Sequence, residues 1–239
     1  MTLLFLNHTP YKEFWTPIRE HLGSIPSKEF PFCEFWERTG SFRAWEEYKP
    51  DPNSPPVWVA HSHGCTFLPQ VREFFALNQN LPTCWINPEL QPLFRNVDNP
   101  VEEVRGRDAD EILQKYSDFV NSGSVKSSRA VEEFTGAFHN SLNYSKALML
   151  EHADLCSSPD EKFLSNFQFG PTLFLLRELE SEAENSTYGR IGLRSFHSLP
   201  ESRIEVIPEL DPFPFQENTL ESLLFHLENF YFKVSRSCE

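Results

Sequence analysis

The stretch Pro56-Val57-Trp58-Val59-Ala60-His61-Ser62-His63-Gly64-Cys65 decides how this chain folds. Residues 57–60 have the continuous apolar character of a strand that is buried on both faces, and residues 61–64 follow as a tight turn. A helix is predicted over residues 66–77, so the chain is expected to bend sharply between a strand and a helix. Ser62 lies at that corner, where its hydroxyl group would be held out from the sheet.

The corner at Ser62 has two interpretations. A serine nucleophile at this place would have the amide of His63 and the positive end of the following helix beside it, where a developing oxyanion needs them. Alternatively, Ser62 only ends the strand and caps the helix, which is a common role for serine. The choice depends on the partners that the rest of the chain supplies.

Other short apolar runs and amphipathic segments surround this stretch. The runs lack the alternation of half-exposed strands, and helical segments separate them near both ends of the chain, as a parallel sheet requires. The sequence therefore predicts an α/β protein with a mostly parallel sheet flanked by helices. The predicted strands are residues 2–6, 30–35, 57–60, 83–86, 172–176 and 204–207, and the predicted helices outside the middle are residues 15–22, 66–77, 191–199 and 220–233.

The middle of the chain is helical in pattern and contains no obvious strand. Residues 108–120, 128–138, 142–152 and 159–167 carry apolar side chains at three- and four-residue spacing. We therefore expect a helical lid, residues 98–166, inserted after the strand at 83–86. Residues 1–97 and 167–239 would form the core.

Composition excludes several classes of partner. The net charge of −14 and scattered Lys and Arg argue against nucleic acid, which clustered basic residues bind. No apolar stretch is long enough to span a membrane, and residues 1–6 are too short for a signal-peptide core, so we expect a cytoplasmic protein. The five cysteines form no Cys-x-x-Cys pair, and His61-x-His63 lacks companion ligand motifs, so we predict no cofactor and no metal. Nothing in the sequence predicts an oligomeric state.

Three stretches in this order resemble the alpha/beta-hydrolase superfamily. Leu4-Phe5-Leu6-Asn7-His8-Thr9, followed by Phe14-Trp15, is similar to the family's strand, His-Gly turn and tryptophan-bearing helix start. Residues 57–64 resemble the nucleophile elbow, with Ala60 at the position of its first glycine. Arg203-Ile204-Glu205-Val206-Ile207-Pro208 is similar to the family's last strand. The family's earliest strands have no counterpart, so the resemblance implies a trimmed and divergent member.

The resemblance implies roles for a few residues. Ser62 matches the nucleophile, and Glu180, after the strand at 172–176, falls where the family's acid usually lies. Asp211, in the loop after the last strand, is the alternative carboxylate behind the imidazole. The family's histidine is absent, because the loop after the last strand has Pro212 nearest to its position. His8 is then the imidazole expected nearest to Ser62, and the amides of His63 and Thr9 would form the oxyanion hole.

Two functions follow from this incomplete triad. The first is a serine hydrolase of the esterase or thioesterase class, acting on a small acyl substrate with an apolar acyl group. The second is a non-catalytic hydrolase-like protein that binds a small apolar ligand or a partner protein. In both, the lid would line the pocket with apolar side chains: Phe119, Phe134, Phe138, Leu142 and Met149.

Overall fold

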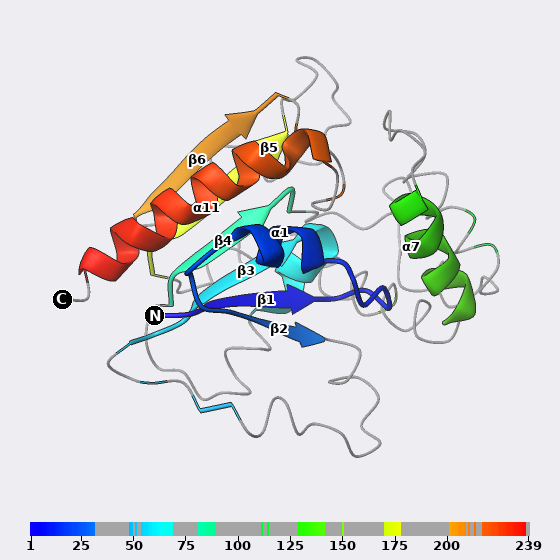
Figure 1. Cartoon of the computed structure of the whole chain (residues 1–239), viewed down its shortest axis with the longest axis horizontal. Coiled ribbons are helices and arrows are strands. Elements are labelled where there is room, and N and C mark those ends of the chain that lie inside the picture. The colour runs from blue at the N-terminus through cyan, green and yellow to red at the C-terminus, as the bar shows by residue number, and fades with distance from the viewer. Residues whose placement is uncertain are drawn as a thin grey trace.

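The computed structural model of the protein describes residues 1–31, 48–49, 51, 54–68, 81–88, 111, 114, 129–141, 150, 170–177, 201–208, 210, 213 and 217–237. These residues build one sheet of six strands in the order β2-β1-β3-β4-β5-β6, and every neighbouring pair is parallel (Figure 1). The parallel α/β architecture predicted from the sequence is therefore confirmed. The strands are β1 (Leu3–Asn7), β2 (Ser27–Pro31), β3 (Val57–His61), β4 (Thr83–Ile86), β5 (Thr172–Arg177) and β6 (Ser202–Ile207).

The inner strands match the sequence prediction closely. β4 has the predicted bounds, β3 and β5 each extend one residue beyond the predicted end, and β1 is shifted by one residue at both ends. All residues of β1, β3 and β4 are buried. Their continuous apolar sequences reflect this burial, because helices or loops cover both faces of an inner parallel strand.

The edge strand β2 differs from its prediction. It comprises Ser27–Pro31, whereas the apolar run had placed it at residues 30–35. Only Phe30 of this strand is buried, so its sequence is mainly polar and apolarity alone could not find its start. Residues 32–35 lie outside the described residues.

Two helices cover one face of the sheet. Helix α1 (Thr16–His21) contacts the long C-terminal helix α11 (Glu217–Ser237), as Figure 1 also shows. Trp15, the residue before α1, donates a hydrogen bond from its indole Nε1 to the Leu6 carbonyl oxygen over 3.1 Å. Tyr231 of α11 donates its hydroxyl to the Met1 carbonyl oxygen over 2.8 Å. The first bond ties the start of α1 to β1, and the second ties α11 to the residues that precede β1.

The helix predicted at residues 66–77 begins earlier and in another form. A 3₁₀ helix, η1, spans Ser62–Phe67 directly after β3. The chain therefore turns at Ser62 without an intervening loop, and residues 69–80 lie outside the described residues. A tight 3₁₀ turn places Cys65, Phe67 and Leu68 in the core, where all three are buried.

Helix α7 (Arg129–Asn140) is the longest described part of the predicted lid. It agrees with the predicted segment 128–138, and Figure 1 shows it beyond the ends toward which the strands point. The other predicted lid helices fall almost wholly outside the described residues, so the lid boundaries at 98 and 166 stay a prediction.

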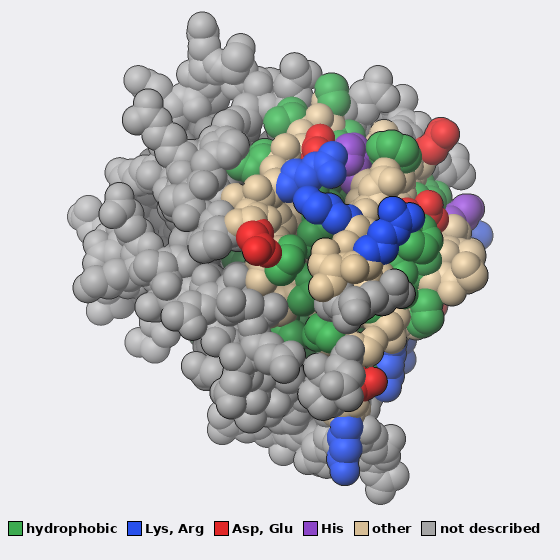
Figure 2. Space-filling model, turned by 90° about the vertical axis from the view of Figure 1, so that its left-hand side faces the viewer, with side chains coloured by type: hydrophobic (Ala, Val, Ile, Leu, Met, Phe, Trp, Pro, Cys, Tyr) green, Lys and Arg blue, Asp and Glu red, His purple; other side chains and the backbone are tan. Residues whose placement is uncertain are grey.

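The described helices carry no membrane span, since none of them combines sufficient length with sufficient apolarity. Figure 2 views the molecule from the side at which β1 begins and α11 ends. Basic, acidic and hydrophobic side chains are interspersed among the described residues of this face.

Candidate active site

Ser62 adopts a backbone conformation that non-glycine residues rarely take. Its φ angle is 49°, in the left-handed region, and it is the residue that joins β3 to η1. Such a conformation costs about 1–3 kcal/mol and is concentrated at functional sites. A serine in a strained turn between strand and helix is the geometry of a nucleophile elbow. Ser62 is half-buried, so the turn does not seal it in the core.

The capping interpretation of Ser62 does not fit the structure. The N-cap of η1 is His61, with the extended angles φ −129° and ψ 142°, and no side-chain capping bond is made there. Ser62 is instead the first residue of η1. A capping serine would have occupied the extended position.

The register of the sheet brings His8 to the level of Ser62. Leu3, Leu4 and Phe5 of β1 lie opposite the residues 54 positions later in β3, from Val57 to Val59. The same offset continued along both strands sets His8 beside Ser62. Both residues directly follow strands that point the same way, so they meet at one edge of the sheet.

Packing confirms that His8 lies against the elbow. A Cβ atom added to Gly64 would come within 2.7 Å of the His8 Nδ1 atom and 3.1 Å of its Cγ. The His8 ring lies 6.3 Å from the His61 ring and 5.7 Å from the Phe14 ring, measured between centroids. His8 is 2% exposed and His61 is 3% exposed. Two buried imidazoles therefore flank the turn that carries Ser62.

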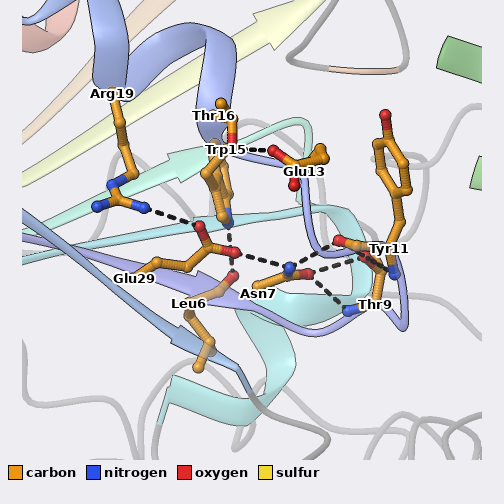
Figure 3. A network of polar contacts seen from close by, with 9 residues as sticks. All are labelled: Leu6, Asn7, Thr9, Tyr11, Glu13, Trp15, Thr16, Arg19 and Glu29. Carbon is orange, nitrogen blue, oxygen red and sulfur yellow. Dashed lines mark hydrogen bonds and ion pairs between the residues drawn. The ribbon is translucent and has the colours of Figure 1, made fainter.

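Asn7 organises the loop that carries His8 (Figure 3). Its amide Nδ2 donates to the Tyr11 carbonyl oxygen over 2.9 Å and to Glu29 Oε1 over 2.8 Å. Its Oδ1 accepts from the Thr9 backbone amide over 2.9 Å and from the Thr9 hydroxyl over 2.8 Å. All of the hydrogen-bonding capacity of this buried side chain is thus used to hold residues 7–11 in one conformation.

Glu29 fastens this loop to the neighbouring strand and helix. It lies on β2, accepts from Asn7 and forms an ion pair of 3.1 Å with Arg19 of α1. Burial raises the pKa of the Glu29 carboxyl group, and the bonds from Asn7 and Arg19 only partly oppose this. Holding the Glu29 carboxylate in this buried place therefore costs solvation free energy. Such a cost suits a group whose role is to position the loop that carries His8.

The amide of Thr9 is engaged by the Asn7 side chain. It was predicted as an oxyanion donor, but it already donates to Asn7 Oδ1. To stabilise an oxyanion at Ser62, it would have to share or exchange that bond. The other predicted donor, the His63 amide, lies in η1 one residue after Ser62.

An aromatic cluster joins α7 to the site. The Phe134 ring of α7 lies 6.1 Å from Phe14, 4.9 Å from Phe138 and 4.8 Å from Phe213. Phe14 in turn lies 5.4 Å from the His61 ring. The predicted lid residues Phe134 and Phe138 are thus buried side by side and reach the elbow through Phe14.

Phe213 belongs to this aromatic cluster, and the sequence interpretation missed it. It is 4% exposed and lies in the loop after β6, one residue beyond Pro212, where the resemblance had implied a histidine. Its place in the run Phe213-Pro214-Phe215 was the available signal, but an apolar residue in a loop does not reveal its partner. The loop after β6 therefore places the Phe213 ring against Phe134 of α7.

The remaining predicted site residues lie outside the described residues. β5 ends at Arg177, three residues before Glu180, and its carboxyl end is two strands away from β3. Phe119, Leu142 and Met149 are likewise not described, nor are Asp211 and Pro212. Their roles stay predictions.

Comparisons with known proteins find solved structures with a similar architecture. No protein-family model and no curated protein sequence matches the chain significantly. Solved structures do match: a putative alpha/beta hydrolase from Nostoc sp. has a TM-score of 0.62 and 12% identity, over 96% of this chain and 90% of that one. A lipase-esterase related protein from Clostridium acetobutylicum has a TM-score of 0.56 and 14% identity, over 96% and 93%.

Another solved structure with this architecture is described as a different kind of enzyme. A 1H-3-hydroxy-4-oxoquinoline 2,4-dioxygenase has a TM-score of 0.64 and 15% identity, over 96% of this chain and 91% of that one. At these identities the likeness concerns the fold. With the parallel sheet order and the strained turn at Ser62, it shows that this chain has the fold of the alpha/beta-hydrolase superfamily.

Proposed function

We propose that the protein is a serine hydrolase of the esterase or thioesterase class, with Ser62 as its nucleophile. The observation that supports this best is the left-handed φ of 49° at Ser62, between β3 and η1. Such strain persists only where the surrounding structure enforces it. In this fold, such a turn serves to expose the nucleophile.

The proposed reaction uses His8 as the proton acceptor. Ser62 Oγ attacks the acyl carbonyl carbon, its proton passes to His8, and the His63 amide donates to the oxyanion. His8 then returns the proton to the leaving alcohol or thiol, which departs and leaves an acyl-enzyme. Water attacks the acyl-enzyme, gives a proton to His8 and releases the carboxylic acid, and the proton on His8 restores the Ser62 hydroxyl. Glu180 is the proposed carboxylate that orients the imidazole.

The aromatic cluster supports an apolar acyl group. Phe14 contacts both imidazoles beside Ser62, and Phe134 continues the cluster into α7. A site next to these rings favours hydrocarbon over charged substituents, because a buried charge without a partner is costly. Phe119, Leu142 and Met149 are proposed to extend this apolar lining.

Labelling with a fluorophosphonate tests the nucleophile directly. We expect covalent modification of Ser62, its loss in Ser62→Ala, and a rate at least about a hundredfold lower in His8→Gln, because general-base catalysis contributes that much. His139→Gln, at an exposed position of α7, is the matched control and should keep the wild-type rate. Label on another residue, or an unchanged rate in His8→Gln, would overturn these assignments.

A non-catalytic binding protein is the second candidate, and Phe213 favours it. An aromatic ring packed on Phe134 stands next to the place where the resemblance implied a histidine. This candidate predicts no fluorophosphonate label, no turnover of p-nitrophenyl esters or acyl thioesters, and fatty-acid binding that is unaffected by Ser62→Ala. Turnover abolished by Ser62→Ala would exclude it.

The dioxygenase among the similar structures adds one control assay. Its described substrate, a hydroxylated oxoquinoline, should be incubated with the protein while dissolved oxygen is followed. We expect no oxygen consumption. Consumption that survives Ser62→Ala would replace the hydrolase proposal with an oxygen-dependent reaction.

A further inference from the structure

Strand β6 forms one edge of the sheet. Its residues Ser202 to Ile207 pair with Thr172 to Arg177 of β5, and no described strand lies on its other side. An edge strand directs a row of backbone N–H and C=O groups away from the sheet, which can template pairing with another chain. The question is which chain this edge fits.

The direction of the backbone groups follows from one hydrogen bond. The Thr172 amide donates to the Glu201 carbonyl oxygen over 3.4 Å. In a parallel ladder the groups of alternate residues point to the same side, so Arg203 and Glu205 also direct theirs toward β5. Ile204 and Val206 therefore direct their N–H and C=O groups outward.

The side chains on this edge are arranged symmetrically about Ile204. Arg203 and Glu205 flank it with opposite charges and form an ion pair with one another along the strand. Their side chains are 52% and 27% exposed, and Val206 is 52% exposed. Reversing the strand direction exchanges the positions of the positive and the negative charge, which is the property of a self-complementary edge.

We propose that β6 pairs with β6 of a second copy of this chain, antiparallel and about a two-fold axis at Ile204. Arg203 of each copy then lies opposite Glu205 of the other. The two sheets join into one continuous sheet, and the interface is isologous, as in most homodimers.

The backbone geometry agrees with this register. Ile204 directs its N–H and C=O groups outward, so the two Ile204 residues form a hydrogen-bonded pair on the axis. The flanking pairs of Arg203 with Glu205 are then non-hydrogen-bonded pairs, in which side chains approach most closely and charge pairs act most strongly. A register shifted by one residue would lose this match, because it would set Arg203 and Glu205 opposite neutral residues. A register shifted by two residues would set two Arg203 or two Glu205 side chains opposite each other.

Charge order distinguishes a second copy from other occupants. A strand from an unrelated protein would need the same order of negative and positive charges around an apolar residue, which only identical strands supply automatically. The copy-to-copy contact also covers Val206, whose exposed side chain lies beside the outward-facing backbone of the same strand. This inference is independent of any catalytic activity.

Sedimentation velocity of the full-length chain, with and without charge changes, tests the proposal. We expect a concentration-dependent dimer for the wild type. Arg203→Glu or Glu205→Arg should weaken it at least about tenfold, because each makes two cross-strand pairs like-charged. The double variant Arg203→Glu with Glu205→Arg should restore dimerisation, since the charges are complementary again.

Two further variants complete the design. Val206→Pro removes an outward N–H without removing a bond to β5, and should leave a folded monomer. Lys233→Glu, an equal change in charge on the exposed side of α11, should leave the dimer intact. A monomeric wild type, or a dimer that persists in both single charge variants and in folded Val206→Pro, would overturn the proposal; so would failure of the double variant to dimerise.

Discussion

His8 packs so closely on Gly64 that a Cβ atom at position 64 would lie 2.7 Å from the His8 Nδ1 atom. This contact joins the loop after β1 to the turn after β3. It explains why a residue without a side chain is required two positions after Ser62. The site therefore depends on a steric match between two segments far apart in the sequence.

Replacing Gly64 tests that match. We expect Gly64→Ala to displace the His8 ring, lower the free energy of unfolding by about 1–3 kcal/mol, and reduce the labelling rate of Ser62. Gly136→Ala is the control, because nothing lies within 4 Å of the added Cβ and alanine favours the helix α7. Urea denaturation measures both. An equally stable Gly64→Ala protein would show that His8 is not confined by the elbow.

The backbone strain at Ser62 should be measurable as a difference in stability between two variants. Ser62→Gly relieves the left-handed φ, whereas Ser62→Ala keeps it, and both remove the nucleophile. We expect Ser62→Gly to be more stable than Ser62→Ala by about 1 kcal/mol, with neither variant labelled by the fluorophosphonate. If the glycine variant proves the less stable of the two in thermal unfolding, the turn stores no strain.

Asn7 should contribute more to stability than a surface hydrogen bond does. Asn7→Ala removes the acceptor of the Thr9 amide and the donor to Glu29 Oε1, so we expect a loss of about 2–4 kcal/mol together with slower labelling of Ser62. Thr16→Ala breaks the exposed bond to Glu13 and should cost less than about 0.5 kcal/mol. Similar losses in the two variants would contradict the assigned role of Asn7.

Glu29 should give stability a specific pH dependence. Because burial raises its pKa in the folded protein, the folded state holds the proton more tightly than the unfolded chain does. Its contribution is fully present below about pH 4.5, near the pKa of the unfolded chain, and is lost as the pH rises through the raised value. The difference in unfolding free energy between the wild type and Glu29→Gln should therefore fall as the pH rises from about 4 to 7. A difference that rises over this range would mean a lowered pKa.

The thiols of Cys65 and Cys84 should be unreactive in the folded protein. Both are fully buried, and burial raises the pKa of each thiol, so almost no thiolate forms at neutral pH. We expect iodoacetamide to modify them only after unfolding, as read by peptide mass mapping. Modification at the same rate with and without denaturant would show that the core beneath the elbow opens readily.

The sequence identified the inner strands because their environment is uniform. Thr83–Ile86 was predicted with its bounds, since a strand covered on both faces must be apolar throughout. The edge strand Ser27–Pro31 was displaced in the prediction, because polar residues such as Glu29 are accepted where one side meets solvent or a buried partner. Part of the site was found in the same way: Ser62 was recognisable from the strand and turn around it.

By itself, the sequence determined the parallel architecture and the sharp turn at Ser62, because apolar runs and a serine–glycine turn act locally. Only the tertiary structure decided that His8 rests on Gly64, that Asn7 binds both Thr9 and Glu29, and that Phe213 packs on Phe134. Those contacts join residues on different strands, loops and helices. Their partners are selected by strand register and packing, which no local pattern records.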